Sequence, residues 1–320
     1  RISAEMTRFG VTLDDSAGES LSDTAAGVFL VRALDAALDP GSAAGLLALA
    51  ASPLFSLGEA RASLRPDLGA IERAGLRGRR PGRSLAELRA FVLERLIETG
   101  ADSLAQRAST LLTRIEDALS PLLSAQGAQP CAVWAEALAR SAEALAADAT
   151  RTGAERLWAG EAGEDAAALI REFLPEAEAL PPVTLREFRA LILETARARR
   201  VRPRYGAHPR LQILGPLEAR LQSADRVILA GLNEGVWPAH PAADPFLSRG
   251  MRIRTGLAAP ERRFGLSAHD FAELAAAPDA VLTRAAKADG APSVASRWLW
   301  RLQTLARGAG EAEAVTASGE

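Results

Sequence analysis

Apolar residues recur every three to four positions through most of the chain between residues 40 and 195. β-Branched residues are few in this stretch, and apolar and polar residues do not alternate there. Such spacing is typical of helices that bury one face. It predicts helices at 43–51, 84–98, 103–119, 132–147, 164–173 and 184–198. The absence of an internal repeat disfavours a helical solenoid, so we expect one compact all-helical region.

Two of these helices begin with the Ser/Thr-x-x-Glu pattern of a capping box. Ser84 is followed by Glu87, and Thr184 by Glu187, so each hydroxyl and carboxylate can satisfy backbone N–H groups of the first turn. Ahead of this region, residues 1–32 predict a helix, a short strand at 11–13, a loop, and a second helix that continues to residue 38. Asp14 and Asp15 lie in the loop, where turn formation explains them better than paired catalytic carboxylates.

Strand and helix patterns alternate after residue 201. Strands are predicted at 210–214, 227–230 and 280–283, a turn or short helix at 217–222, and helices at 264–277 and 293–307. Strands that alternate with helices on this scale indicate a parallel sheet. The predicted fold class is therefore α/β and predominantly helical.

Composition limits the function classes. With 320 residues, 48% of them hydrophobic, the chain is long enough for two domains with real cores. The net charge of −2 disfavours a globally basic nucleic-acid binder but allows a local basic groove. The single cysteine, Cys131, excludes a disulfide framework or an iron–sulfur cluster built from this stretch alone. No signal peptide or membrane-spanning run is visible, so we expect a cytoplasmic protein without a membrane partner.

The ends of the sequence suggest an internal fragment. It starts without Met, inside a predicted amphipathic helix, and residues 308–320 form an Ala/Gly/Glu-rich tail.

The most informative segment is Arg226-Val-Ile-Leu-Ala-Gly-Leu-Asn-Glu-Gly-Val-Trp-Pro238. A short apolar run ends at Gly231 and is followed by a loop that contains a second glycine. This pattern is typical of a buried parallel strand followed by a loop at the edge of the sheet where functional residues lie. This sequence resembles the segment after motif V of UvrD/RecB-like superfamily 1 DNA helicases. More narrowly, it resembles the AddB subunit of the bacterial AddAB helicase–nuclease, and residues 11–18 and 27–30 also match that family.

The resemblance implies a discontinuous RecA-like domain and a partner subunit. Residues 1–32 and 198–307 would form the second RecA-like domain, interrupted by a 2B-like helical insertion at 33–197. An AddB-type protein would process double-strand break ends for homologous recombination, with DNA and an AddA-like helicase–nuclease subunit as partners. The family's ATP and Mg site, iron–sulfur cluster and nuclease metal would lie elsewhere. We therefore expect this stretch to have no cofactor, no metal and no catalytic residue. The alternative is a fragment of an active superfamily 1 ATP-dependent DNA helicase.

The motor motifs themselves are degenerate. When the chain is aligned with motif V, Arg220 falls where active helicases have a lysine, and Leu221 replaces the glycine that follows it. Glu218 lies two positions before Arg220 in the same motif. Motif VI keeps its start, but the arginine that would reach the γ-phosphate falls on or near Phe271. Residues 282–285 resemble the lost ending at a displaced position. The residues that carry these remnants, apart from Glu218 and Arg220, are Gly231, Asn233, Glu234, Glu261, Arg262 and Arg263.

An arginine cluster marks the return from the helical region. We expect its members to face a groove that binds the DNA backbone, with Arg220 near its floor. The cluster comprises Arg197, Arg199, Arg200, Arg202 and Arg204. A solvated hinge is the competing interpretation, and burial in ion pairs would favour a helical interaction scaffold without a nucleic-acid role. The histidines His208, His240 and His269 lack metal-ligand spacing.

Overall fold

The computed structural model describes residues 2–174, 180–202, 208, 210–220, 222–240, 244–259, 261–288 and 290–311. The chain divides into two compact units, Arg1–Arg210 and Leu211–Glu320, called here the first and the second unit. The first unit is predominantly helical, the second combines short strands with three helices in its described residues, and the strands of both units are short.

The first unit is an assembly of helices with a few strand residues at its edge. Its elements are α1 (Ile2–Arg8), β1 (Asp14–Asp15), β2 (Glu19–Ser20), η1 (Leu21–Asp23), α2 (Ala25–Leu38), α3 (Ala43–Ala51), α4 (Arg61–Ile71), η2 (Glu72–Leu76), α5 (Leu85–Glu98), α6 (Asp102–Ser124), α7 (Cys131–Ala146), α8 (Gly153–Leu157), α9 (Gly160–Glu172), α10 (Leu185–Ala198) and β3 (Arg200–Val201).

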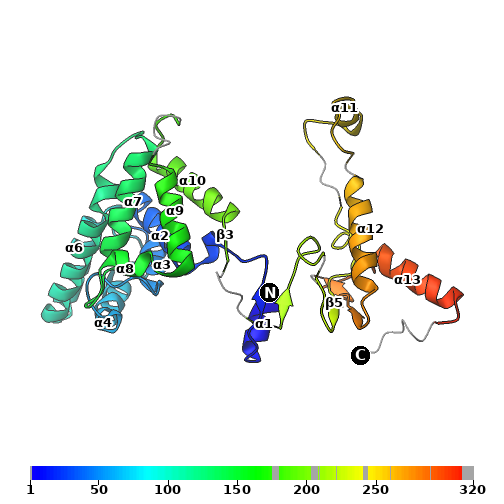
Figure 1. Cartoon of the computed structure of the whole chain (residues 1–320). Helices are drawn as coiled ribbons and strands as arrows, with labels where there is room; N and C mark the ends of the chain where they lie inside the picture. Colours follow the sequence, from blue (N-terminus) through cyan, green and yellow to red (C-terminus); the bar gives the residue numbers. More distant parts are fainter. Residues whose placement is uncertain are drawn as a thin grey trace. The chain divides into compact units, whose positions relative to one another are not determined.

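Helices α2 and α7 lie at the centre of the first unit, and both contact α6, α9 and α10 (Figure 1). Phe29 of α2 is fully buried, and Trp134 of α7 is almost fully buried and donates its Nε1 hydrogen to the Val183 carbonyl at 2.8 Å. A single cluster of apolar side chains joins all the helices from α2 to α10. The burial of so much apolar surface is the main force that holds this unit together.

The helix predictions are confirmed where the apolar period was regular. All six predicted helices are present, although α6 and α9 are longer than expected, and both predicted capping boxes form. Three longer elements had not been predicted: α4, which contains Pro66; the π-helical turn η2; and α8, which has a capping box of Thr152 and Glu155. The short elements β2, η1 and β3 had not been predicted either. The predicted strand at 11–13 is wrong, because β1 lies at Asp14–Asp15.

Helix α2 crosses residue 32, where the sequence predicted a domain boundary, and packs as one piece in the first unit. Leu21 and Phe29, assigned from the sequence to the RecA-like domain, are buried in the core of the first unit. The reason is the width of the apolar stripe on α2, which buries eight of its residues against neighbouring helices. The assignment of 1–32 and 198–307 to one domain stays a prediction.

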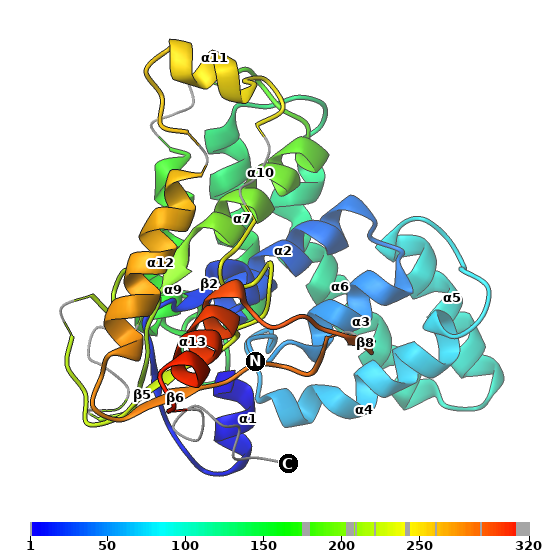
Figure 2. The same ribbon diagram turned by 90° about the vertical axis from the view of Figure 1, so that its right-hand side faces the viewer.

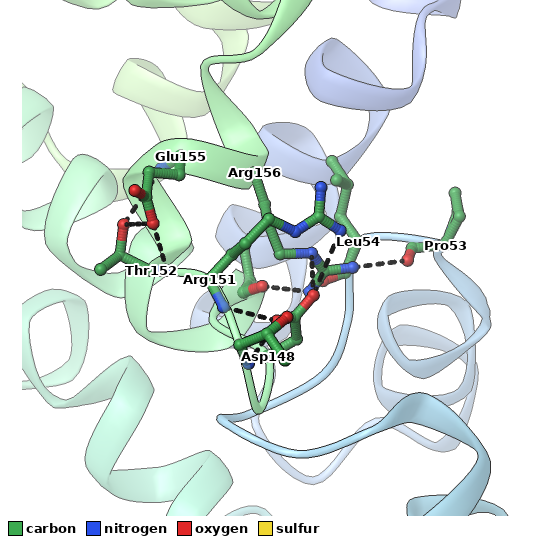
Figure 3. A network of polar contacts seen from close by, with 9 residues as sticks. Pro53, Leu54, Asp148, Arg151, Thr152, Glu155 and Arg156 are labelled. Carbon is green, nitrogen blue, oxygen red and sulfur yellow. Dashed lines mark hydrogen bonds and ion pairs between the residues drawn. The ribbon is translucent and has the colours of Figure 1, made fainter.

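A nearly buried guanidinium fixes the loop after α3 to the end of α7. Arg156 donates to the carbonyls of Pro53 and Leu54 at 3.3 and 3.2 Å and also to that of Ala146 (Figure 3). Its charge is balanced by Asp148, 3.0 Å away, whose carboxylate also accepts two backbone N–H groups. These hydrogen bonds, with that of the Thr150 N–H the strongest, hold the pKa of Asp148 well below its ordinary value.

The second unit alternates strands with helices, as predicted. Its elements are β4 (Gln212–Ile213), β5 (Val227–Leu229), α11 (Arg249–Arg254), α12 (Arg262–Ala275), β6 (Ala280–Leu282), β7 (Lys287–Ala288), β8 (Ala291–Pro292) and α13 (Arg297–Gly308). Strands β5 and β6 pair in parallel, with α12 in the connection between them, and β7 pairs antiparallel with β8. Helix α11 was not predicted.

The core of the second unit is small and lies on one face of the β5–β6 pair. Leu229 of β5 and Leu232 after it are buried with Phe271 of α12 and Leu299 of α13, and Figure 2 shows both helices beside the strands. On the other face, Ile228 and its register partner Val281 are 61% and 38% exposed. Parallel pairing is thus observed in the described residues.

Candidate functional site

The arginine cluster begins at the end of α10 and continues into β3, which lies beside β2. Strand β3 pairs antiparallel with β2, so that Ser20 lies opposite Arg200 and Glu19 opposite Val201. The Ser20 hydroxyl lies 3.2 and 3.1 Å from the carbonyls of Ala196 and Arg197 and ties β2 to the end of α10. The two crossings between the helical core and the rest of the chain are therefore fixed side by side.

Gly18 permits this close approach. Its φ is +64°, and a Cβ there would lie 2.4 Å from the carbonyl oxygen of Val201. A side chain at this position would force β2 and β3 apart. The sequence predicted a turn around Asp15, and the Asp15 carboxylate does accept the N–H of Ala17 at 3.0 Å.

Two of the clustered arginines have carboxylate partners. Arg197 and Glu194 form an exposed pair on α10 at 2.7 Å, and Arg199 donates to Glu172 at 2.6 Å and to the Asp165 carbonyl at 3.2 Å. Only 24% of the Arg199 side chain is exposed, so its role is to join α10 to α9. That Arg199 faces DNA stays a prediction; in the structure its guanidinium binds Glu172 and the Asp165 carbonyl.

Arg200 and Arg202 differ from these two. Both are exposed, and no ion pair or side-chain hydrogen bond of either is present among the described residues. The exposed Glu19 is the nearest carboxylate along the β2–β3 ladder. Arg204 lies outside the described residues. The guanidinium groups of Arg200, on the paired strand β3, and of Arg202, directly after it, therefore have no partner among the described residues, which suits them to phosphate contacts.

In the second unit, the motif loop is fixed by a buried amide. Strand β5 ends at Leu229, Gly231 turns the chain with a φ of +75°, and Asn233 is 6% exposed. The Asn233 side chain donates to the Ala285 carbonyl at 2.7 Å and to Ser293 Oγ at 2.8 Å, and accepts the Ala285 N–H at 2.9 Å. Asn233 therefore joins the loop after β5 to the segment after β6 and to the approach to α13.

Glu234 continues this linkage to the start of α13. Its carboxylate accepts the backbone N–H of Arg297 at 3.1 Å and pairs with the Arg297 guanidinium, which lies 5.1 Å from the ring centroid of Phe264. The hydrogen bond from the Arg297 side chain is the main reason that the pKa of Glu234 is lowered. Gly231, Asn233 and Glu234 are thus structural residues of the loop.

The predicted motif V and motif VI positions meet in one ion pair. Arg220 donates from Nε to Asp270 of α12 at 2.7 Å, and the Asp270 side chain is 8% exposed. This hydrogen bond raises the pKa of Arg220. Phe271, where the resemblance places the arginine finger, lies in the core with its ring edge-on to Trp237 at 6.1 Å. That Arg220 contacts DNA stays a prediction; in the structure its guanidinium is bound by Asp270.

The remaining motif residues have no shared site. Glu261 accepts from Arg249 at 2.6 Å, whereas Arg262, Arg263 and Glu218 are exposed. Among the described residues, Arg284 donates to the carbonyl of Ala285 at 3.4 Å. Sequence reasoning missed Asp270 and Arg297, the partners that fix the predicted residues, since no local signal links positions so far apart.

The described residues do not fit an iron–sulfur cluster or a metal site of their own. Cys131, the only cysteine of the sequence, is fully buried in α7, and a cluster needs several thiolates. No group of three or more His, Cys, Asp or Glu side chains in the described ranges could hold a metal ion. His269 lies 3.6 Å from Glu273 on the surface of α12.

A scan against protein-family models gave no match, and neither did a search of curated proteins. Within the part of the chain that the structure describes, no helix combines the length and the apolar character needed to cross a bilayer.

Proposed function

We propose that this chain is part of a cytoplasmic AddB-type subunit that acts on double-strand break ends for homologous recombination. In this proposal its RecA-like region, interrupted by the helical insertion, binds DNA and an AddA-like subunit, and supplies no motor chemistry. ATP, Mg, the iron–sulfur cluster and the nuclease metal belong to other parts of the complex.

The observation that carries the proposal is the free pair formed by Arg200 on β3 and Arg202 directly after it. Their neighbour Arg199 is bound by carboxylate and carbonyl oxygens, while these two guanidinium groups face solvent on a backbone fixed by β2. Exposed arginines on a fixed strand give phosphate contacts without base readout. We therefore expect affinity for DNA that does not depend on its sequence.

The motor positions support a structural role for the second unit. An arginine that stabilises a developing charge on phosphate must be free to reach it. Arg220 is instead held by Asp270, and Phe271 is committed to the core. The loop after β5 likewise uses Asn233 to fix neighbouring backbone.

The test is the affinity of the purified chain for a fluorescein-labelled duplex, measured by anisotropy. The variant R200Q/R202Q should bind about ten-fold more weakly at low salt, because two phosphate contacts are lost. The matched control R65Q/R79Q removes the same charge from two other exposed arginines of the first unit and should bind as the unchanged chain does. Equal affinity of all three proteins would contradict the proposal.

Hydrolysis of ATP separates this proposal from the active helicase. The chain should hydrolyse no ATP with or without single-stranded DNA. A rate that is abolished by Arg220→Ala or Arg284→Ala would instead establish a working motor.

A further inference from the structure

Helix α13 carries an exposed tryptophan on a helix that is otherwise well anchored. Its inner face buries Leu299 and Ala306 and packs Leu302 against the core of the second unit. Trp300 projects from the opposite face with 65% of its surface exposed. An indole in this position gives up most of the stabilisation that its burial could provide, which favours a ligand-binding role.

The start of the helix is rigidly held, so the position of Trp300 is defined. Ser296 is fully buried, and its hydroxyl accepts the N–H of Trp298 at 3.3 Å, while Glu234 binds both the backbone and the side chain of Arg297. Thr304 donates to the carbonyl of Trp300 at 2.8 Å one turn later. A fixed aromatic side chain loses little conformational entropy when it binds a flat ligand.

The charge on α13 is entirely positive. Its sequence contains Arg297, Arg301 and Arg307 and no acidic residue. Glu234 neutralises Arg297, which leaves Arg301, over the ring of Trp298 at 5.5 Å, and Arg307 as cations without a carboxylate partner among the described residues. At about 100° per residue, Arg307 lies on the same face as Trp300, two turns further along, and Arg301 lies beside that face.

We propose that Trp300 stacks on an unpaired base of single-stranded nucleic acid while Arg301 and Arg307, further along the helix, contact its phosphates. This inference rests on the proposed DNA-binding function and adds a second, strand-selective surface to it. The bases of a duplex hide their faces in the stack, whereas a single strand offers them to an aromatic side chain. The positive charge of the helix favours a phosphate backbone over a neutral protein surface.

The experiment compares two strands of equal length, a short oligothymidylate and its abasic counterpart, which keeps the phosphates and lacks the bases. Binding to the unchanged chain, Trp300→Ala and Trp300→Phe is measured by anisotropy. Trp300→Ala should lose about ten-fold in affinity for the oligothymidylate and none for the abasic strand. Trp300→Phe should retain most of the affinity, because a smaller aromatic ring still stacks.

A matched control and the variant R200Q/R202Q distinguish the possible failures. Leu305→Ala removes another apolar side chain of α13, 71% exposed, from a different part of the surface and should bind both strands normally. If Trp300→Ala binds oligothymidylate normally while R200Q/R202Q is weakened on both strands, the stacking surface is refuted and the proposed function stands. If R200Q/R202Q changes nothing, the proposed function fails at its own site. If Trp300→Ala and Leu305→Ala are equally weak on both strands, α13 is a general apolar contact surface and the inference is overturned.

Discussion

The two units of this chain reach a defined structure by different means. The first buries one large cluster of apolar side chains, shared by all helices from α2 to α10. The second has four buried apolar residues at its centre and relies on polar links between segments distant in sequence: Arg220 with Asp270, Asn233 with Ala285, and Glu234 with Arg297. Directional hydrogen bonds thus compensate for a small core.

The largest effect should follow from opening the core of the first unit. Phe29→Ala removes a fully buried ring and should lower the free energy of unfolding by about 3–5 kcal/mol, since both the transfer energy and the cavity contribute. Urea denaturation followed by circular dichroism measures this change. Phe9→Ala, at a position 80% exposed, is the control and should have little effect. A small loss for Phe29→Ala would show that packing does not dominate this unit.

The second effect should come from the buried amide of the second unit. Asn233→Ala leaves the N–H of Ala285 without its partner, although the Ala285 carbonyl keeps the Ser293 hydroxyl, and should destabilise this unit by roughly 1–3 kcal/mol. Hydrogen exchange at the N–H of Ala285 reports the change locally and should become much faster. Gln222→Ala, which removes an exposed amide, should leave exchange as it was. Slow exchange in Asn233→Ala would mean that the core alone holds the loop.

The contrast between an apolar core and long-range polar links also explains which parts of each unit could be predicted from the sequence. The helices of the first unit could be predicted because each repeats its apolar period over several turns and two begin at capping boxes. The end of β5 and the turn at Gly231 could also be predicted, from local glycine and strand signals. The ion pair of Arg220 could not, because Asp270 follows 50 positions later and nothing local marks it as the partner. For the same reason, Arg200 could not be distinguished from Arg199.

A smaller effect concerns pH. Because the pKa of Glu234 is lowered in the folded chain by its hydrogen bond from Arg297, its pairing stabilises the second unit above the ordinary value of 4.5. This stabilisation should decline as pH falls below 4.5 and disappear below the lowered pKa. Glu234→Gln should therefore be less stable than the unchanged chain at neutral pH and equally stable in acid. A difference between the two that persists unchanged into acid would contradict the role of the Glu234 charge.

The most direct test of the central claim compares arginines from the two units by the salt dependence of DNA binding. The claim is that Arg200 and Arg202 are free to contact phosphate, whereas Arg220 serves only to hold Asp270. Each lost phosphate contact lowers the slope of log affinity against log salt by about 0.7–0.9. The account predicts that R200Q/R202Q reduces the slope by about 1.5 and that Arg220→Gln leaves it unchanged. A reduced slope for Arg220→Gln, with no change for R200Q/R202Q, would contradict it.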